Sequence, residues 1–330
     1  MQKNMLIAVG SGGLSAVASM AFLSGMPGGL LFVYLATLPI FMVAFSMGTV
    51  AASIAAVSGI VMAGIIGGNL TAGAYGLFHA LPAWFVSRQN LSSRQGPDGS
   101  VVWYPLGNVL SALSILCAVL MVIGALVFAG NSVDSIEQSI TTTLFETFSI
   151  MMPSLSDAEM LAMVGMLAAI FPGAMGGSWV VMTAINAVLA QAIVVRMGCN
   201  LRPTPRFMHM DLPQWAAWPL IITAVAALAL DGESRYMAQN VSLILATPFF
   251  FLGLSVIHWA VRRISFSPAL LTIFYLIMVV SGWALMLVAA LGMIEQWAGI
   301  RSRFSDIKNN ESNNDLTKSD NSDTDGHNGQ

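Results

Sequence analysis

Charged residues are absent from long stretches of this chain. No Asp, Glu, Lys or Arg occurs from Met5 to Ser87, nor in five further stretches: Pro105–Val133, Met160–Val195, Leu212–Leu230, Tyr236–Val261 and Ile264–Ile294. A soluble protein needs charge over its surface, and stretches of this length would leave too little of it. Because about 20 apolar residues in a helix span a bilayer core, the pattern predicts an all-α, polytopic transmembrane helix bundle.

The first stretch, residues 5–87, is long enough for about four crossings. Short Gly-containing interruptions divide it, and such short turns predict antiparallel neighbours in contact. The helices expected here are about Met5–Ser24, Leu30–Met47, Val50–Gly67 and Leu70–Ser87. A fifth helix is expected over 105–130, with Pro105 in its first turn, where the missing N–H costs nothing.

Residues 132–152 have a different pattern. Apolar residues recur every three or four positions, as Val133, Ile136, Ile140, Leu144, Phe148 and Met151. Asp134 and Glu137 form a plausible capping pair at the start. This spacing predicts an interfacial amphipathic helix. A helix packed on the rim of the protein itself would give the same pattern, so both interpretations remain open.

A second capping box, Ser156 with Glu159, begins the apolar segment 157–198. As one helix, its charge-free part would measure about 54 Å, against a hydrocarbon core of roughly 30 Å. We therefore expect the helix to break, and the break should fall at Pro172, Gly173, Gly176 and Gly177. Either two short spans result, or a re-entrant half-helix precedes one full span.

Three last helices are expected within residues 212–300, at about Trp215–Leu230, Met237–Val261 and Ala269–Ile294. The transmembrane domain is thus 1–300, with about nine spans and a range of 8–10. Residues 301–330 are rich in Asn, Ser and Asp and almost free of apolar residues. Such a polar tail cannot bury a core, so we expect it to be disordered.

Lys and Arg in loops set membrane orientation, because the cytoplasmic side carries the excess. The count is the same whether segment 157–198 crosses the membrane once or twice: eight of the 13 basic residues lie on the same side as Lys3, and five lie on the opposite side. We therefore expect a cytoplasmic N-terminus in the bacterial inner membrane. The side of the C-terminal tail stays open.

The composition narrows the class of function. The chain is 56% hydrophobic and 9% charged, with a net charge of −3, and no basic stripe suggests nucleic acid as a partner. Cys117 and Cys199 lie far apart, and no His or Cys pair has metal-ligand spacing. The chain has no Walker A loop and no acid or base well inside a span. We expect no enzyme, no cofactor, no metal and no energy source of its own.

Four polar residues are candidates for binding a substrate. A helix break frees backbone groups at mid-membrane, which often marks a binding site in transporters, and Asn186 and Gln191 follow the predicted break. His79 and Asn240 are the other polar residues deep inside spans. Simpler roles remain open: a kink or hairpin turn at the break, a histidine that donates one interhelical hydrogen bond, and an asparagine that bridges helices.

Ala8, Gly12 and Ala16 form a stripe of small residues on the first helix. Small residues let helix backbones approach closely in lipid. The stripe could dock another membrane subunit, or it could pack inside this chain's own bundle.

Several motifs together carry a resemblance. They are Asp98–Gly107 (DGSVVWYPLG), Leu212-Pro213-x-Trp215, Asn240, Phe251–Ser255 (FLGLS) and Leu291–Trp297 (LGMIEQW) before Arg301. In this order they resemble the YybS-like family of uncharacterised bacterial membrane proteins, in its alphaproteobacterial form, over residues 5–303. Glu295 stands where relatives would be expected to have Asp.

The resemblance implies no catalytic residue. The N-terminal helices are also distantly similar to the substrate-binding subunits of energy-coupling-factor vitamin transporters, which use a small-residue stripe on the first helix to dock a partner. This similarity is one of fold only.

Two functions fit these observations. The first is a small-solute binding or transport subunit without its own energy source, whose solute, unknown in identity, is neutral or weakly polar. The second is a non-enzymatic membrane scaffold or assembly factor that uses the charged loops 88–104 and 196–214.

Overall fold

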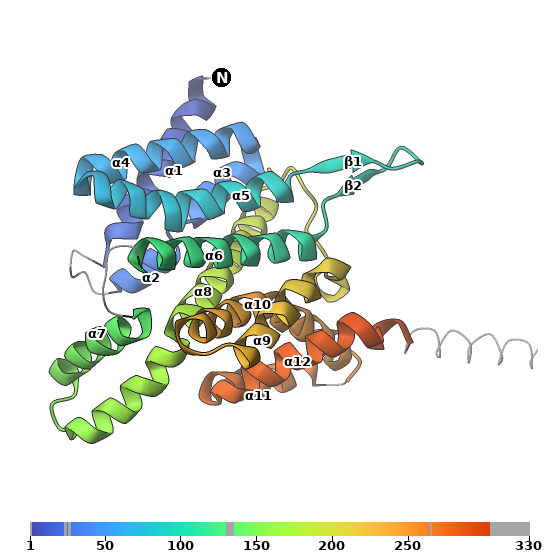
Figure 1. Ribbon diagram of the computed structural model, residues 1–330. Coiled ribbons are helices and arrows are strands. Elements are labelled where there is room, and N and C mark those ends of the chain that lie inside the picture. Colours follow the sequence, from blue (N-terminus) through green and yellow to red (C-terminus); the bar gives the residue numbers. More distant parts are fainter. Residues whose placement is uncertain (1, 23–24, 26–27, 130–134, 265, 304–330) are drawn as a thin grey trace, which may run out of the picture. The chain divides into compact units, whose positions relative to one another are not determined.

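The computed structural model describes residues 2–22, 25, 28–129, 135–264 and 266–303. Helices account for nearly all of them (Figure 1). The elements are α1 Gln2–Met20, α2 Gly29–Tyr34, α3 Leu38–Met47, α4 Thr49–Tyr75, a π-helical turn Gly76–Ala80, α5 Leu81–Asn90, β1 Ser93–Gln95, β2 Val101–Trp103, α6 Leu106–Ala129, α7 Ile136–Met151, α8 Asp157–Arg196, 3-10 turns Phe207–His209 and Gln214–Ala216, α9 Ala217–Ala229, α10 Gly232–Val261, α11 Ser267–Val280 and α12 Gly282–Ala298.

The chain divides into two units. The first contains residues 1–206 and 210–248, and the second contains 207–209 and 249–330. The division falls inside α10, directly after Pro248.

The predicted fold class, an all-α membrane bundle, is confirmed. Among the described residues, five helical segments are long and apolar enough to cross a membrane, or six if the bent pair α11–α12 counts as one span. The predicted nine spans exceed this count for identifiable reasons. The count takes Thr49–Asn90 as a single segment, α9 is short, and α1 begins with the polar run Gln2-Lys3-Asn4.

The segment Thr49–Asn90 is a helical hairpin. Gly68 has φ 80° and ψ −176°, a conformation that glycine alone adopts readily. Tyr75 then packs against Gly59, where any Cβ would collide with the phenol ring, and Trp84 Nε1 donates to Ser53 Oγ at 3.0 Å. Residues farther before Gly68 therefore contact residues farther after it, so the two helices are antiparallel, as predicted.

The small-residue stripe of α1 is buried within this chain. Ala8 and Ala16 are 0% exposed, and a Cβ at Gly12 would collide with the Ala55 carbonyl oxygen on α4. The expectation of a partner-docking face at Ala8, Gly12 and Ala16 is therefore wrong. The hairpin of α4 occupies the close approach that the small residues permit.

The predicted break in segment 157–198 is also wrong. Helix α8 runs without interruption through Pro172 for 40 residues, about 60 Å at the usual rise. It begins at the predicted capping box, in which Ser156 and Glu159 each bond the other's backbone N–H. One continuous helix leaves no second crossing for this segment.

Helix α7 is amphipathic in sequence, and none of its residues is buried. Its N-cap is Ser135, whose Oγ accepts from Gln138 N at 3.1 Å, in place of the expected Asp134, which lies outside the described residues. Glu233 Oε1 also accepts from Ile136 N at 3.2 Å. The helix packs on α8 and α6, and its location at the membrane interface stays a prediction.

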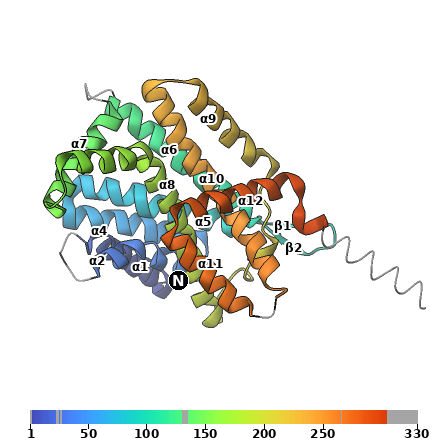
Figure 2. The same cartoon turned by 90° about the horizontal axis from the view of Figure 1, so that it is seen from below.

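The expected last span, Ala269–Ile294, is broken in the second unit. Helices α11 and α12 meet at an angle of 118° (Figure 2), because Ser281 is extended, with φ −111° and ψ 95°. Before the pair, Arg262 Nη1 contacts Met208 Sδ at 3.6 Å, and after it Arg301 Nη1 donates to Met208 O at 2.7 Å. The residues on both sides of the pair therefore contact Met208, and the bent pair is either a broken span or a re-entrant loop.

The predicted tail, 301–330, needs a new boundary. Residues 304–330 lie outside the described residues. The Arg301 side chain, however, is only 11% exposed, and the chain is helical through residue 303.

Candidate functional site

The first unit contains a cavity of about 300 Å³ at the end of α1, which is open to the surface, since its lining residues Leu70 and Phe78 are 88% and 52% exposed. Met20 closes α1, and Leu70 follows the hairpin turn at Gly68. The lining residues are Ser19, Met20, Leu70, Thr71, Ala74, Tyr75, Phe78 and His79. From Leu70 to His79 the wall extends about 13 Å along the helix, roughly half of a hydrocarbon core.

His79 lies in the π-helical turn Gly76–Ala80, a local widening that often accompanies functional sites. Its ring stacks on Tyr75, with centroids 5.7 Å apart. His79 Nδ1 is buried and has no hydrogen-bond partner among the described residues. The turn is held by α8, since Trp179 Nε1 donates to Phe78 O at 2.8 Å.

Asn240 bridges helices, which was the simpler of its two possible roles. It is 0% exposed, and its Oδ1 accepts from Gly173 N at 2.8 Å. Its Nδ2 donates to Ala169 O at 3.0 Å and to Tyr236 O at 2.9 Å. Asn240 therefore has no free donor for a substrate.

Tyr236 completes the support of α8. Pro172 has no N–H, so the carbonyl four residues earlier loses its helical partner. The Tyr236 hydroxyl donates to that carbonyl, Ala168 O, at 2.8 Å. Tyr236 and Asn240, one turn apart on α10, thus satisfy the backbone groups that the proline releases, which explains why α8 continues.

Asn186 and Gln191 are engaged elsewhere on α8. Asn186 Nδ2 donates to Tyr34 O at 2.6 Å, and Gln191 Nε2 donates to Arg202 O at 2.8 Å. Asn186 is about 20 Å along α8 from Gly173, the contact of Asn240. Of the four predicted substrate-binding residues, His79 lines this cavity, and the other three do not.

Arg202 is a buried cation that sequence reasoning assigned to a polar loop. It is 6% exposed, and its Nη1 donates to Asn90 O at 2.7 Å and to Asn90 Oδ1 at 2.6 Å. Its Nη2 donates to Tyr104 O at 3.1 Å, and the guanidinium lies 5.6 Å from the Trp103 ring centre. Burial lowers the pKa of this guanidinium, which still stays charged. Arg202 fastens the β1–β2 hairpin to the bundle.

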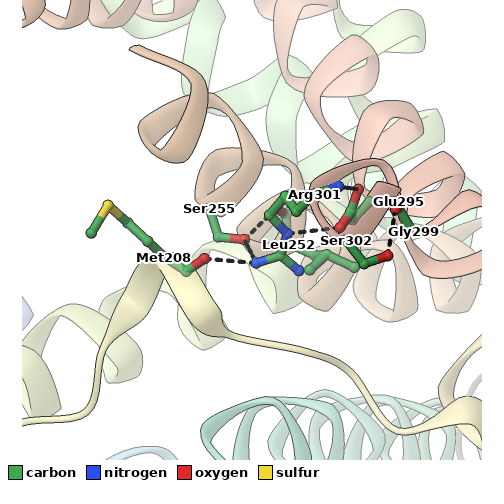
Figure 3. Close-up of polar contacts among 7 residues, drawn as sticks. All are labelled: Met208, Leu252, Ser255, Glu295, Gly299, Arg301 and Ser302. Atoms are coloured by element: carbon green, nitrogen blue, oxygen red, sulfur yellow. Dashed lines mark hydrogen bonds and ion pairs between the residues drawn. The ribbon is translucent and has the colours of Figure 1, made fainter. Parts of the chain in front are cut away.

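The second unit contains a buried ion pair (Figure 3). Arg301 Nε donates to Glu295 Oε1 at 2.7 Å, with only 11% and 5% of the two side chains exposed. Arg301 Nη1 also lies 3.4 Å from Ser255 Oγ, as a donor, in addition to its bond to Met208 O. The sequence signal that could have indicated this ion pair is the LGMIEQW motif, because it places the Glu295 carboxylate next to the last apolar residues.

Within the residues that the structure describes, no group of three His, Cys, Asp or Glu side chains could hold a metal ion. Cys117 and Cys199 are free thiols. Cys117 lies inside the bundle, with its Sγ 3.5 Å from Gly176 O on α8.

A helical bundle with apolar spans, buried polar crosslinks and a cavity between helices defines a polytopic α-helical membrane protein. The chain belongs to the family described as predicted membrane protein (DUF2232), whose model matches residues 13–295. Neither the curated proteins nor the solved structures contain a match to this chain.

Proposed function

We propose that this membrane protein is a small-solute binding or transport subunit without an energy source of its own. The observation that carries the proposal is His79, which lines the 300 Å³ cavity and whose buried Nδ1 has no hydrogen-bond partner among the described residues. A buried polar group is costly unless something bonds it. A ligand in the cavity would supply that bond.

The cavity wall suggests the chemistry of the solute. Ligand sites are mostly apolar, with a few polar groups that fix orientation. Met20, Leu70 and Phe78 supply apolar surface, and no charged side chain lines the cavity. The solute we propose is therefore neutral, with an apolar body and one group that hydrogen-bonds to His79. At about 300 Å³ the site is at the small end of the usual range.

The arrangement of charges supports an orientation for the first unit in the bacterial inner membrane. Ala8, near the start of α1, packs with Val43 and Ala51, and Leu201 N donates to Phe45 O at 2.9 Å. The basic residues at this end are Lys3, Arg88, Arg94, Arg196, Arg202 and Arg206. By the positive-inside rule this end is cytoplasmic, and the cavity at the opposite end of α1 opens on the outer side.

A solute subunit of this kind needs a partner or acts passively, because the chain has no nucleotide-binding loop. The stripe on α1 is not available for it, since α4 covers that face.

The alternative, a scaffold or assembly factor, draws on one observation. The β1–β2 hairpin extends from the bundle (Figure 1), and Val101 on it is 57% exposed. Arg202 anchors the hairpin at its base. An anchored, exposed hairpin suits a contact with another protein.

The experiment that separates the two functions is native mass spectrometry of protein purified in lipid nanodiscs. We expect a small molecule to accompany the wild-type protein and the His209→Leu control, whose histidine is exposed, but not His79→Leu. Equal melting temperatures of the variants would exclude misfolding as the cause. A wild-type protein free of any small molecule, or equal occupancy in all variants, would contradict the solute-binding function.

A further inference from the structure

Two adjacent arginines, Arg262 and Arg263, directly follow α10. The helix is long and apolar enough to cross a membrane, and its part Tyr236–Val261 contains no Asp, Glu, Lys or Arg. That part measures about 39 Å, which exceeds the roughly 30 Å of the hydrocarbon core but not the 40–45 Å that includes the headgroups. The two guanidinium groups therefore lie at the level of the lipid headgroups.

The side chain of Arg263 is held in place by a tryptophan. Its guanidinium carbon lies 3.8 Å from the centre of the Trp259 ring, a close cation–π contact. Stacking engages the flat face of the guanidinium and leaves the N–H groups at its edge, where they form a rigid fork of donors. Trp is also a residue that marks the membrane–water interface. Arg263 thus presents oriented donors at that interface.

The side chain of Arg262 is exposed and weakly bound. Its Nη1 lies 3.6 Å from Met208 Sδ, and a thioether is a poor acceptor. Within the described ranges of the chain, no carboxylate forms an ion pair with Arg262 or with Arg263. Both guanidinium groups therefore keep donors, and a positive charge, for a ligand.

The second unit has no spare acid to neutralise this charge. Among its described residues only Glu295 is acidic, whereas four are arginines. Glu295 Oε1 already accepts from Arg301 Nε at 2.7 Å. Arg301 Nη1 also donates to Met208 O, while the side chain of Met208 points away from Arg301 (Figure 3). A neutral ion pair therefore adjoins Arg262, whose own charge is uncompensated.

Apolar side chains follow the two arginines. Ile264 is 53% exposed and Phe266 is 83% exposed. A surface that combines guanidinium groups, a tryptophan and exposed apolar side chains matches a phospholipid, in which a phosphate adjoins acyl chains. A soluble phosphate compound would leave the apolar part of this surface without a partner.

We propose that Arg262 and Arg263, the latter oriented by Trp259, bind the phosphate of an anionic phospholipid. Ile264 and Phe266 then lie against its acyl chains. Guanidinium groups bind phosphates through paired N–H donors, and basic residues beside a membrane span attract anionic lipids. A zwitterionic headgroup fits less well, because the two arginines repel its ammonium group. The inference does not depend on the solute proposed for the cavity of the first unit.

Titration of lipid into the full-length, delipidated protein in a neutral detergent, followed by native mass spectrometry, tests the proposal. The probes are phosphatidylglycerol and, as the reference without net charge, phosphatidylcholine. We expect Arg262→Gln/Arg263→Gln to weaken phosphatidylglycerol binding roughly thirtyfold and to leave phosphatidylcholine binding unchanged. The matched control, Arg94→Gln/Arg235→Gln, removes the same charge from two other exposed arginines and should keep the wild-type affinity.

Equal affinity of the wild-type protein for the two lipids would overturn the proposal, as would phosphatidylglycerol binding that is unchanged in Arg262→Gln/Arg263→Gln or equally weakened in the control. If the double variant does not fold, Arg263→Gln alone should weaken phosphatidylglycerol binding about fivefold, and an unchanged affinity would contradict the inference. Displacement of phosphatidylglycerol by millimolar inorganic phosphate would identify a soluble phosphate as the ligand and overturn the lipid as its source.

Discussion

The support of α8 at Pro172 makes a quantitative prediction. Asn240→Ala removes the acceptor of Gly173 N–H and a donor to Ala169 O, and both backbone groups are then left in an apolar interior. An interhelical hydrogen bond in a membrane is worth about 0.6 kcal/mol on average, whereas an orphaned buried group costs about 1–3 kcal/mol. With two groups affected, we expect a loss of roughly 1–6 kcal/mol in the free energy of unfolding.

A double-mutant cycle with Pro172→Ala isolates the cause. Alanine restores the N–H of residue 172 and lets α8 resume its own hydrogen bonds to Ala168 and Ala169. Asn240→Ala should therefore cost less in that background, and Tyr236→Phe should become nearly neutral. We expect coupling energies of at least about 1 kcal/mol, within the range for contacting residues.

Unfolding by sodium dodecyl sulfate in mixed micelles, followed by tryptophan fluorescence, gives the free energies. Ser242→Ala is the matched control on α10, because the Ser242 hydroxyl bonds only within its own helix, to Ala238 O. A coupling energy below about 0.3 kcal/mol, the usual limit of additivity, would refute the reasoning.

Three further predictions concern packing, charge and topology. Gly12→Leu should lower the melting temperature strongly or abolish folding, while Gly10→Leu, which meets nothing within 4 Å, should leave it unchanged; equal melting temperatures would contradict the packing of α1 on α4. Glu295→Ala should destabilise by about 3 kcal/mol, because it removes the carboxylate that Arg301 Nε bonds, and Glu295→Ala/Arg301→Met should recover part of that loss in the same unfolding assay. Reporter fusions after Arg263 and after Arg303 should report the same side of the membrane; opposite sides would show that α11 and α12 cross it.

Local patterns predicted the local features of the fold. The charge-free stretches indicated membrane helices, and the interruption near Gly68 indicated the hairpin, because a left-handed glycine and short turns leave a signature within a few residues. The capping box at Ser156 and Glu159 is equally local, since its bonds join residues three apart.

The candidate site was predicted less well. His79 lines the cavity, but Asn240, Asn186 and Gln191 bond to three different places. Nothing in the spacing of polar residues tells which carbonyl each side chain will meet. Arg202, which is buried, and Arg301, whose side chain is 11% exposed, were assigned to a loop and to the tail, because burial of a charge depends on backbone oxygens supplied by distant segments.

By itself the sequence determined that this protein resides in lipid, that it is helical and where most helices begin and end, because hydrophobicity and turn chemistry act over one or two helical turns. Only the tertiary structure decided whether Pro172 breaks a helix, whether the α1 stripe is free and whether the last apolar stretch forms one straight helix. Each of these depends on partners far along the chain: the hydroxyl that replaces the lost N–H at Pro172 comes from Tyr236, 68 residues after the carbonyl it bonds.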